Sequence, residues 1–232
     1  MSGSFFAMCH AWRSPAGTMV VIKGAPETVL RICGCPEKMA DVERAAARGL
    51  RLLAVAETPW SGALLEDPAG YPFRFVGFVA LSDPLRASVP QAVALCRRAG
   101  IRVVMITGDY PGTALEIARQ AGVQAGGVIT GAEIAAMDDA GLARAVERVS
   151  VFARVRPEQK LRLVAAYKAA GEVVAMTGDG VNDAPALKAA HIGIAMGERG
   201  TDVAREAAAL VLLDDDFSSI VAAVRLGRRI LD

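Results

Sequence analysis

The sequence predicts an α/β fold in which a parallel sheet carries helices on both faces, preceded by a partial α+β domain. Beyond residue 82, short apolar runs alternate regularly with segments of helical periodicity, which is typical of parallel strands joined by crossover helices. Two of these runs end in the same tripeptide, Thr-Gly-Asp, at residues 107–109 and 177–179. Because strands joined in this way run in one direction, we expect both tripeptides at one edge of the sheet.

Residues 1–82 have a mixed pattern, and a loop containing proline and glycine spans residues 58–72. We expect strands at 19–22, 50–56 and 73–81, and helices at 27–31 and 41–48.

Residues 83–216 carry the regular alternation, and a last helix follows at 217–231. The other expected helices are 88–99, 113–121, 132–136, 140–149, 158–170, 184–190 and 201–208. The expected strands are 101–107, 128–130, 151–153, 172–176, 192–195 and 210–213.

The second Thr-Gly-Asp opens the most informative stretch, Thr-Gly-Asp-Gly-Val-Asn-Asp-Ala-Pro at residues 177–185. It places Asp179, Asn182 and Asp183 within five residues, directly after a buried apolar strand. Carboxylate and amide oxygens suit a hard cation such as Mg²⁺, and the flanking glycines allow a sharp turn close to a ligand. A simpler alternative makes Asp183 only the N-cap of helix 184–190. We expect Asp183 to cap this helix as well, but capping explains neither Asp179 nor the glycines.

The first Thr-Gly-Asp supplies Thr107, Gly108 and Asp109. A threonine hydroxyl and the backbone amides of such a turn can hold a phosphate oxygen. The tripeptide is also a common strand-to-helix turn, so on its own it leaves a structural role equally open.

Lys160 lies in the first turn of a helix that begins at Pro157 and places Leu161, Val164 and Ala165 on one face. The helix dipole disfavours a cation there by up to ~1 kcal/mol. Either Lys160 faces an anion, or it is solvated and Glu158 offsets the cost; the segment alone does not distinguish the two.

These motifs together resemble the later motifs of haloacid-dehalogenase-like phosphotransferases. The longer strings resemble the phosphorylation domain of P-type cation-transporting ATPases: residues 177–188, Gly-Ile-Ala-Met-Gly at 193–197 and Gly-Thr-Asp-Val-Ala at 200–204. Lys-Gly-Ala-Pro-Glu at 23–27 resembles the nucleotide-domain motif of the calcium-pump-like subgroup. Asp-Pro-Leu-Arg at 83–86 resembles the hinge between domains, with Leu85 in place of a second proline.

The resemblance implies a role for each candidate residue, with ATP and Mg²⁺ as cofactors. Lys23 and Arg51 would bind ATP, Asp179 would hold Mg²⁺, and Lys160 would neutralise the transferring phosphoryl group, whose oxygens Thr107 and Gly108 would bind. Asn182 and Asp183 would order the site, Asp83 and Arg86 would form the hinge, and Asp109 and Arg154 would contact nucleotide as the domains close.

The resemblance also implies a division into residues 1–82, the end of a nucleotide-binding domain; 83–216, a phosphorylation domain without its first strand; and 217–232, a stalk helix. The partners would be ATP, the remaining pump domains and, only in the complete protein, the transported cation. That protein would place this chain at the cytoplasmic face of a membrane, whereas the chain alone is expected to be soluble.

The nucleophile motif of such pumps, Asp-Lys-Thr-Gly-Thr, is absent: no Asp-Lys pair occurs in the sequence. We therefore expect an internal piece of a pump that is inactive alone. In the family the strand carrying this motif lies between the strands that end at Thr107 and Met176. We expect residues 75–81 to fill that slot, or the two strands to close up directly.

Composition fits this interpretation and restricts the alternatives. A net charge of +1 gives no argument for nucleic-acid binding, and no apolar run reaches the roughly 18–20 residues that span a bilayer. A haloacid-dehalogenase-like phosphatase would need an Asp-x-Asp motif near the chain start, and the only near match is Asp214–Asp216. A non-catalytic nucleotide- or Mg²⁺-binding module also stays open.

Overall fold

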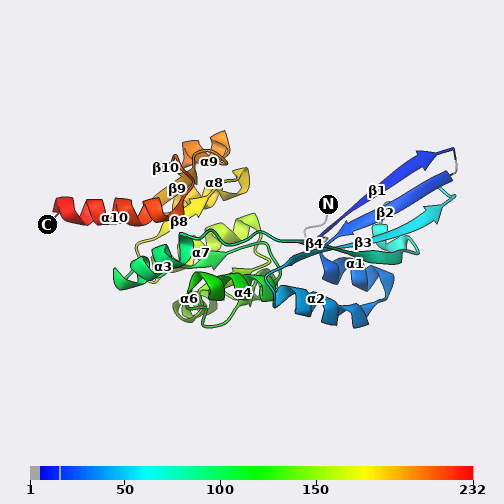
Figure 1. Cartoon of the computed structure of the whole chain (residues 1–232), viewed down its shortest axis with the longest axis horizontal. Coiled ribbons are helices and arrows are strands. Elements are labelled where there is room, and N and C mark those ends of the chain that lie inside the picture. The colour runs from blue at the N-terminus through cyan, green and yellow to red at the C-terminus, as the bar shows by residue number, and fades with distance from the viewer. Residues whose placement is uncertain (1–5, 16, 232) are drawn as a thin grey trace. The chain divides into compact units, whose positions relative to one another are not determined.

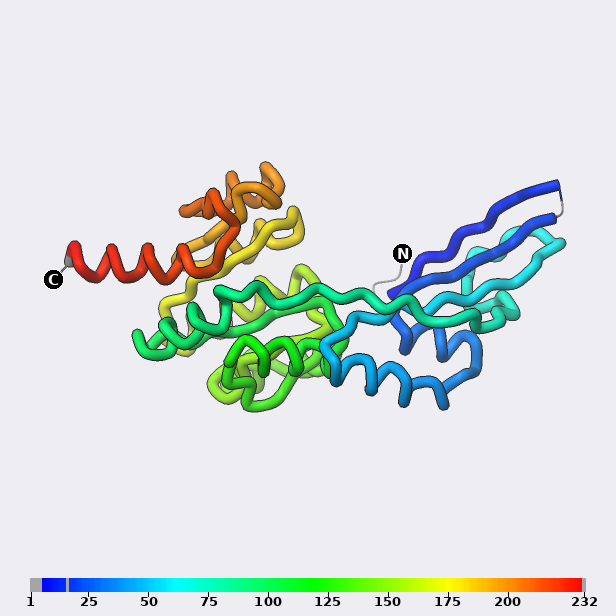
Figure 2. The backbone as a smooth tube through the Cα atoms, in the orientation of Figure 1, coloured from blue at the N-terminus to red at the C-terminus, as the bar shows by residue number. Residues whose placement is uncertain are grey.

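The computed structural model describes residues 6–15 and 17–231. The chain divides into two compact units, Met1–Pro84 and Leu85–Asp232 (Figures 1 and 2). Each unit has its own sheet structure and its own hydrophobic core.

The first unit is an antiparallel sheet in the order β1-β2-β3-β4. Its strands are β1 (Ala7–Ser14), β2 (Gly17–Gly24), β3 (Arg51–Trp60) and β4 (Arg74–Leu81), and its helices are α1 (Pro26–Cys33) and α2 (Met39–Ala46). Short 3₁₀ turns lie at Pro36–Lys38 and Pro68–Gly70. Strand β1 was not expected from the sequence.

One face of this sheet is buried beneath α1. Val20 and Ile22 of β2 pack with Ala54 and Ala56 of β3 and with Val29 of α1, and all five are almost fully buried. Alternate residues of β2, such as Lys23, are exposed, as expected for a strand with one covered face.

The second unit contains two parallel sheets of three strands, in the orders β5-β7-β6 and β10-β9-β8. The strands are β5 (Met105–Ile106), β6 (Ile129–Thr130), β7 (Val151–Ala153), β8 (Ala175–Gly178), β9 (Ile192–Met196) and β10 (Leu210–Leu212). The helices are α3 (Val89–Arg98), α4 (Pro111–Ala121), α5 (Gly131–Ala136), α6 (Asp139–Arg148), α7 (Pro157–Ala169), α8 (Ala184–Ala189), α9 (Asp202–Ala207) and α10 (Phe217–Leu231), with a 3₁₀ turn at Val181–Asp183.

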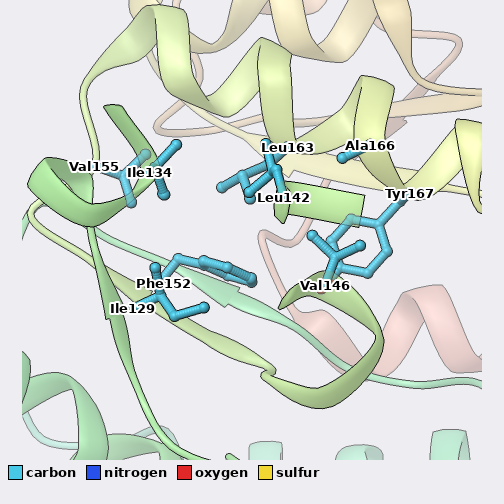
Figure 3. Packing of buried hydrophobic residues seen from close by; sticks show 9 residues of the cluster. All are labelled: Ile129, Ile134, Leu142, Val146, Phe152, Val155, Leu163, Ala166 and Tyr167. Atoms are coloured by element: carbon cyan, nitrogen blue, oxygen red, sulfur yellow. The ribbon is translucent and has the colours of Figure 1, made fainter. Parts of the chain in front are cut away.

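Helix α7 packs against both parallel sheets. Leu163 belongs to the core of the first sheet, with Phe152 and Leu142 (Figure 3), whereas its neighbour Val164 belongs to the core beside β8 and β9. Both residues are buried. Val164 therefore lies on the buried side as expected, but Leu161 and Ala165 are exposed, so the expectation was wrong for these two residues. A helix that contacts two cores buries a wider surface than one face with a period of 3.6 residues.

The expectation for the missing central strand was also wrong. Residues 75–81 belong to β4, which pairs with β3 in the first unit, and Phe75 and Phe78 pack against that core. Within the described residues β5 pairs only with β7, and β8 only with β9. Direct closure would place the two strands about 4.8 Å apart, but β5 and β8 belong to separate sheets, and α7 contributes buried side chains to the cores of both.

None of the helices in residues 6–15 and 17–231 is both long enough and apolar enough to cross a membrane.

Candidate functional site

The first Thr-Gly-Asp turn follows β5 and is tied to the strand beside it. The backbone N–H of Thr107 donates to the carbonyl of Phe152 (2.9 Å), and the N–H of Val155 donates to the carbonyl of Thr107 (3.1 Å). Within the turn, the Thr107 hydroxyl accepts from the Asp109 N–H (3.1 Å) and donates to Asp109 Oδ2 (3.1 Å). The hydroxyl thus stabilises the turn in this conformation.

Arg154 joins this turn from the loop after β7. Its backbone N–H donates to the Asp109 carbonyl (3.2 Å), and Nη1 donates to the Gly108 carbonyl (3.0 Å). Its φ of 52° is uncommon for a residue with a side chain. The structure therefore brings four of the candidate residues together: Thr107, Gly108, Asp109 and Arg154.

A second group of candidates meets after β8. Lys160 Nζ lies 2.5 Å from Asp183 Oδ1, and Asp183 Oδ2 accepts from the Gly180 N–H (3.2 Å). The side chains of Lys160 and Asp183 are only 20% and 9% exposed. Of the two possibilities for Lys160, the structure thus has the lysine facing an anion, which is a carboxylate of this chain.

Asp183 occupies the N-cap position of α8, but its side chain makes no capping hydrogen bond. The expectation that it also caps this helix was wrong, because Lys160 and the Gly180 amide use both carboxylate oxygens. Asp183 serves the turn after β8 rather than the helix.

The two Thr-Gly-Asp glycines have different surroundings. A Cβ added at Gly178 would lie 2.5 Å from the Cβ of Asp183, whereas a Cβ at Gly108 would have nothing within 4 Å. Gly178 is therefore required by the close approach of Asp183, and Gly108 leaves its backbone open to a ligand.

Asp179 and Asn182 are both exposed beside this pair. The Asp179 carbonyl accepts from the Thr201 N–H (2.8 Å), which ties the turn to the start of α9. In the described parts of the chain, no group of three or more His, Cys, Asp or Glu side chains could hold a metal. The exposed Asp179 carboxylate by itself fits an ion such as Mg²⁺, which keeps several waters and is bound through one or two carboxylates.

Lys23 and Arg51 belong to the first unit. Lys23 pairs with Val55, and Arg51 lies four residues before Val55 on β3, so both side chains project from the same face of the sheet. That face is opposite the one covered by α1. Four residues of strand separate the two positions by about 13 Å, so they would contact different groups of a ligand and not one phosphate together.

Two structural links were not expected. Arg86 Nη1 donates to the Asp215 carbonyl (2.5 Å), and the buried Asp215 carboxylate accepts from three consecutive backbone amides of the loop after β9. The only signal in the sequence was the run of three aspartates at 214–216.

Comparison with known proteins places this chain in a family. The family model described as haloacid dehalogenase-like hydrolase matches residues 17–191, and the chain belongs to this family. This membership agrees with the parallel strands, flanking helices and acidic turns described above.

More closely, the chain is similar to part of several cation pumps. It is 49% identical over 250 aligned residues to "Probable cation-transporting ATPase F" of Mycobacterium bovis, covering 98% of this chain and 27% of the relative. It is 44% identical to "Cation-transporting ATPase pma1" of Synechocystis (92% of this chain, 26% of the relative). It is 40% identical to "Calcium-transporting ATPase 1" of Yarrowia lipolytica (92% and 25%).

The chain thus spans about a quarter of the length of these relatives. The resemblance to P-type cation-transporting ATPases and the α/β fold expected from the sequence are confirmed.

Proposed function

We propose that this chain contributes to the phosphorylation site of an ATP-driven cation pump, at the cytoplasmic face of a membrane. In that role it supplies residues that bind nucleotide, phosphate and Mg²⁺, and the strand that carries the aspartyl nucleophile comes from another segment. The transported cation and the remaining pump domains would be partners of the complete protein only.

The observation that carries this proposal is the position of the two acidic turns. Each turn follows a strand, β5 or β8, whose second edge has no ladder partner among the described residues. Ile106 of β5 and Met176 of β8 contact the same core cluster, so both strands border one region. One strand inserted in parallel there would end between the Thr107 turn and the Lys160–Asp183 pair.

The residues around that position suit phosphoryl transfer, which depends on positioning and charge neutralisation. Lys160 would neutralise charge on the phosphoryl group while Asp183 holds its ammonium in place. Gly108 exposes backbone that can approach a phosphate oxygen, and Thr107 would add its hydroxyl after releasing Asp109. Asp109 and Arg154, already joined in one turn, would contact nucleotide.

Asp179 is the carboxylate left available for Mg²⁺, because Asp183 is paired with Lys160. The ion would supply positive charge beside the phosphate, and its other positions would be taken by water and phosphate oxygens. Asn182 lies three residues further on and would order that water shell.

Lys23 and Arg51 would bind ATP on the open face of the first unit's sheet. Both are exposed on this face, and their spacing of about 13 Å suits two different parts of an extended nucleotide.

The phosphatase alternative is weaker, because the Asp214–Asp216 run has structural partners. Asp215 binds backbone amides, Asp214 accepts from Ser219 Oγ (2.7 Å), and Asp216 accepts from the Ser218 N–H (2.9 Å). A nucleophilic carboxylate must instead face substrate.

A complementation experiment tests the proposal. The chain is mixed with a second polypeptide that carries an apolar strand followed by Asp-Lys-Thr-Gly-Thr, and labelled ATP and Mg²⁺ are added. We expect the two to co-elute and the second polypeptide to retain acid-stable, hydroxylamine-sensitive phosphate. The chain alone, and a second polypeptide with its aspartate replaced by asparagine, should retain none.

If the two polypeptides do not co-elute, the proposed insertion of a strand is wrong. If they co-elute but no label is retained, the proposed role in phosphoryl transfer is wrong. Label on the chain alone would show that a nucleophile is present here and would also contradict the proposal.

A further inference from the structure

Asp215 has an unusual backbone and an unusual environment. Its φ is 51°, which disfavours residues with a side chain, and its carboxylate is only 3% exposed. Such a conformation persists when surrounding contacts determine it, and here the contacts are specific.

The carboxylate binds the loop after β9 through backbone donors. Oδ1 accepts from the N–H groups of Gly197 (2.7 Å) and Glu198 (3.1 Å), and Oδ2 accepts from the N–H of Arg199 (3.0 Å). Successive backbone N–H groups form a concave site for an anion, and in this loop the occupant is a side chain of the same chain.

The carbonyl side of the same loop is held as well. Arg205 Nη1 donates to the carbonyls of Gly197 (3.0 Å) and Gly200. The loop therefore has an anion on its amide side and a cation on its carbonyl side, which fixes its conformation from both directions.

Thr201, which follows this loop, connects the loop to the acidic turn after β8. The Thr201 N–H donates to the Asp179 carbonyl (2.8 Å), while the Thr201 hydroxyl caps α9 by accepting from the Ala204 N–H (3.3 Å). Hydrogen bonds at the two ends of the Arg199–Thr201 backbone thus connect Asp215 to the turn that carries the candidate metal ligand.

Asp215 also receives contacts from the start of the unit. Arg86 donates to its carbonyl (2.5 Å), and Ser88 Oγ, at the start of α3, donates to Asp216 Oδ1 (3.1 Å). The residues before α3 and α10 are therefore connected through Asp215 to the loop after β9.

We propose that Asp215 is a positioning residue that sets the backbone of the Asp179 turn through the Gly197–Arg199 loop and the Thr201 amide. The effect of Asp215 on Mg²⁺ binding rests on the proposed function of Asp179 as a metal ligand. The hydrogen bonds that connect Asp215 to the Asp179 turn do not depend on that function. Asp215 does not touch the ion and acts through the placement of the Asp179 carboxylate.

Two matched pairs of variants test the proposal. Asp215→Asn keeps the shape but removes the charge and one acceptor, and Asp214→Asn makes the same change next to it without touching the loop. Thr201→Pro removes the N–H that reaches Asp179, and Thr201→Ala removes only the capping hydroxyl. The Thr201 φ of −69° suits a proline ring.

The first measurement is amide hydrogen exchange by NMR in the intact chain. The Gly180 N–H reports on the Asp179 turn, because it belongs to the same peptide unit as the Asp179 carbonyl that Thr201 binds. In Asp215→Asn we expect the Thr201 amide to exchange faster and the Gly180 amide resonance to shift. In Asp214→Asn neither should change. In Thr201→Pro the Gly180 resonance should move further than in Thr201→Ala. If Asp215→Asn does not fold, the Thr201 pair carries the test, because it leaves the carboxylate in place.

The second measurement is the Mg²⁺ dissociation constant by calorimetry. Changes in groups that orient a ligand weaken metal binding by about tenfold or more, and we expect this for Asp215→Asn and Thr201→Pro but not for Asp214→Asn. Such a selective loss is not expected from a residue that contributes to stability alone.

The outcomes separate the two proposals. An unchanged Gly180 resonance in both Asp215→Asn and Thr201→Pro would overturn the positioning role, even if Asp179→Asn abolishes Mg²⁺ binding. Conversely, if Mg²⁺ binding does not depend on Asp179, the proposed metal role fails while the exchange data still decide the path.

Discussion

Lys160 and Asp183 form an ion pair that joins the two parallel sheets of the second unit, with Nζ 2.5 Å from Oδ1. Lys160 belongs to the helix after β7, and Asp183 follows β8, so each sheet contributes one partner. The pair explains why a lysine is tolerated in the first turn of α7, where the helix dipole alone would disfavour it. It also holds the ammonium close to the turn that follows β8.

Breaking this pair should destabilise the chain. Lys160→Met leaves a buried carboxylate without its cation, and Asp183→Asn leaves the lysine unpaired; we expect each to lower the free energy of unfolding by about 1–3 kcal/mol. The double variant should lose less than the sum of the two, because the groups interact directly. Urea unfolding followed by circular dichroism measures this.

Asp139→Asn is the matched control, because that carboxylate is 93% exposed although it pairs with Arg162. It should leave the unfolding midpoint unchanged. Strictly additive effects of Lys160→Met and Asp183→Asn would show that the pair does not couple in solution.

The two Thr-Gly-Asp glycines should respond differently to alanine. Gly178→Ala places a methyl group against Asp183 and should destabilise by about 1–3 kcal/mol, as overpacking does. Gly108→Ala meets nothing within 4 Å and should be nearly neutral. Denaturant midpoints of the two variants make the comparison, and equal losses would contradict the difference in packing.

Mg²⁺ should bind weakly to the isolated chain. Asp179 is a single exposed carboxylate, and Mg²⁺ gives up its waters reluctantly. Calorimetric titration should show weak binding that falls further in Asp179→Asn and persists in Asp139→Asn. Tight binding that survives Asp179→Asn would place the ion elsewhere.

Asp215 should make stability sensitive to acid. Burial acts to raise the pKa of its carboxyl, but hydrogen bonds from the backbone amides of Arg199, Glu198 and Gly197 outweigh it, and the pKa is lowered. A lowered folded-state pKa stabilises the chain above the unfolded-state pKa of about 3.9. That contribution is lost as the pH falls through the lower folded-state value.

Thermal midpoints measured between pH 7 and pH 3 test this sign. Asp215→Asn should be less stable than the parent at pH 7, and the difference should shrink toward pH 3. The thermal midpoint of Asp215→Asn will itself still fall with pH, because the pKa values of Asp214 and Asp216 are also lowered, through hydrogen bonds from Ser219 and Ser218 respectively. A constant difference across the range would contradict the assignment.

The sequence predicted the features that depend on local pattern. Strands followed by Thr-Gly-Asp turns, and the start of α7 at Pro157, follow from apolar runs, glycine and proline. Two pairs of candidate residues that the resemblance assigned to one site, Lys160 with Asp183 and Thr107 with Asp109, are indeed in contact.

Features that depend on distant contacts were not predicted. Strand β1 is exposed along most of its length, so it lacks the alternation that identifies a half-buried strand. The Asp215 carboxylate meets amides 16 to 18 residues earlier in the chain, and backbone amides leave no signature in a sequence. The burial of α7 on two cores had the same cause, because the second core is formed by elements that follow it.

The edges of β5 and β8 that pair with no other strand in residues 6–15 and 17–231 have a thermodynamic consequence. An occupant that binds only the folded chain adds RT ln(1 + [L]/Kd) to its stability, about 2.7 kcal/mol at a hundredfold excess over Kd. The melting temperature of the second unit would then rise with the concentration of the occupant. The stability of the second unit then depends on the concentration of a second segment. A free energy of unfolding measured on the isolated chain is the value at zero occupant, and it is the lowest value that the unit can have.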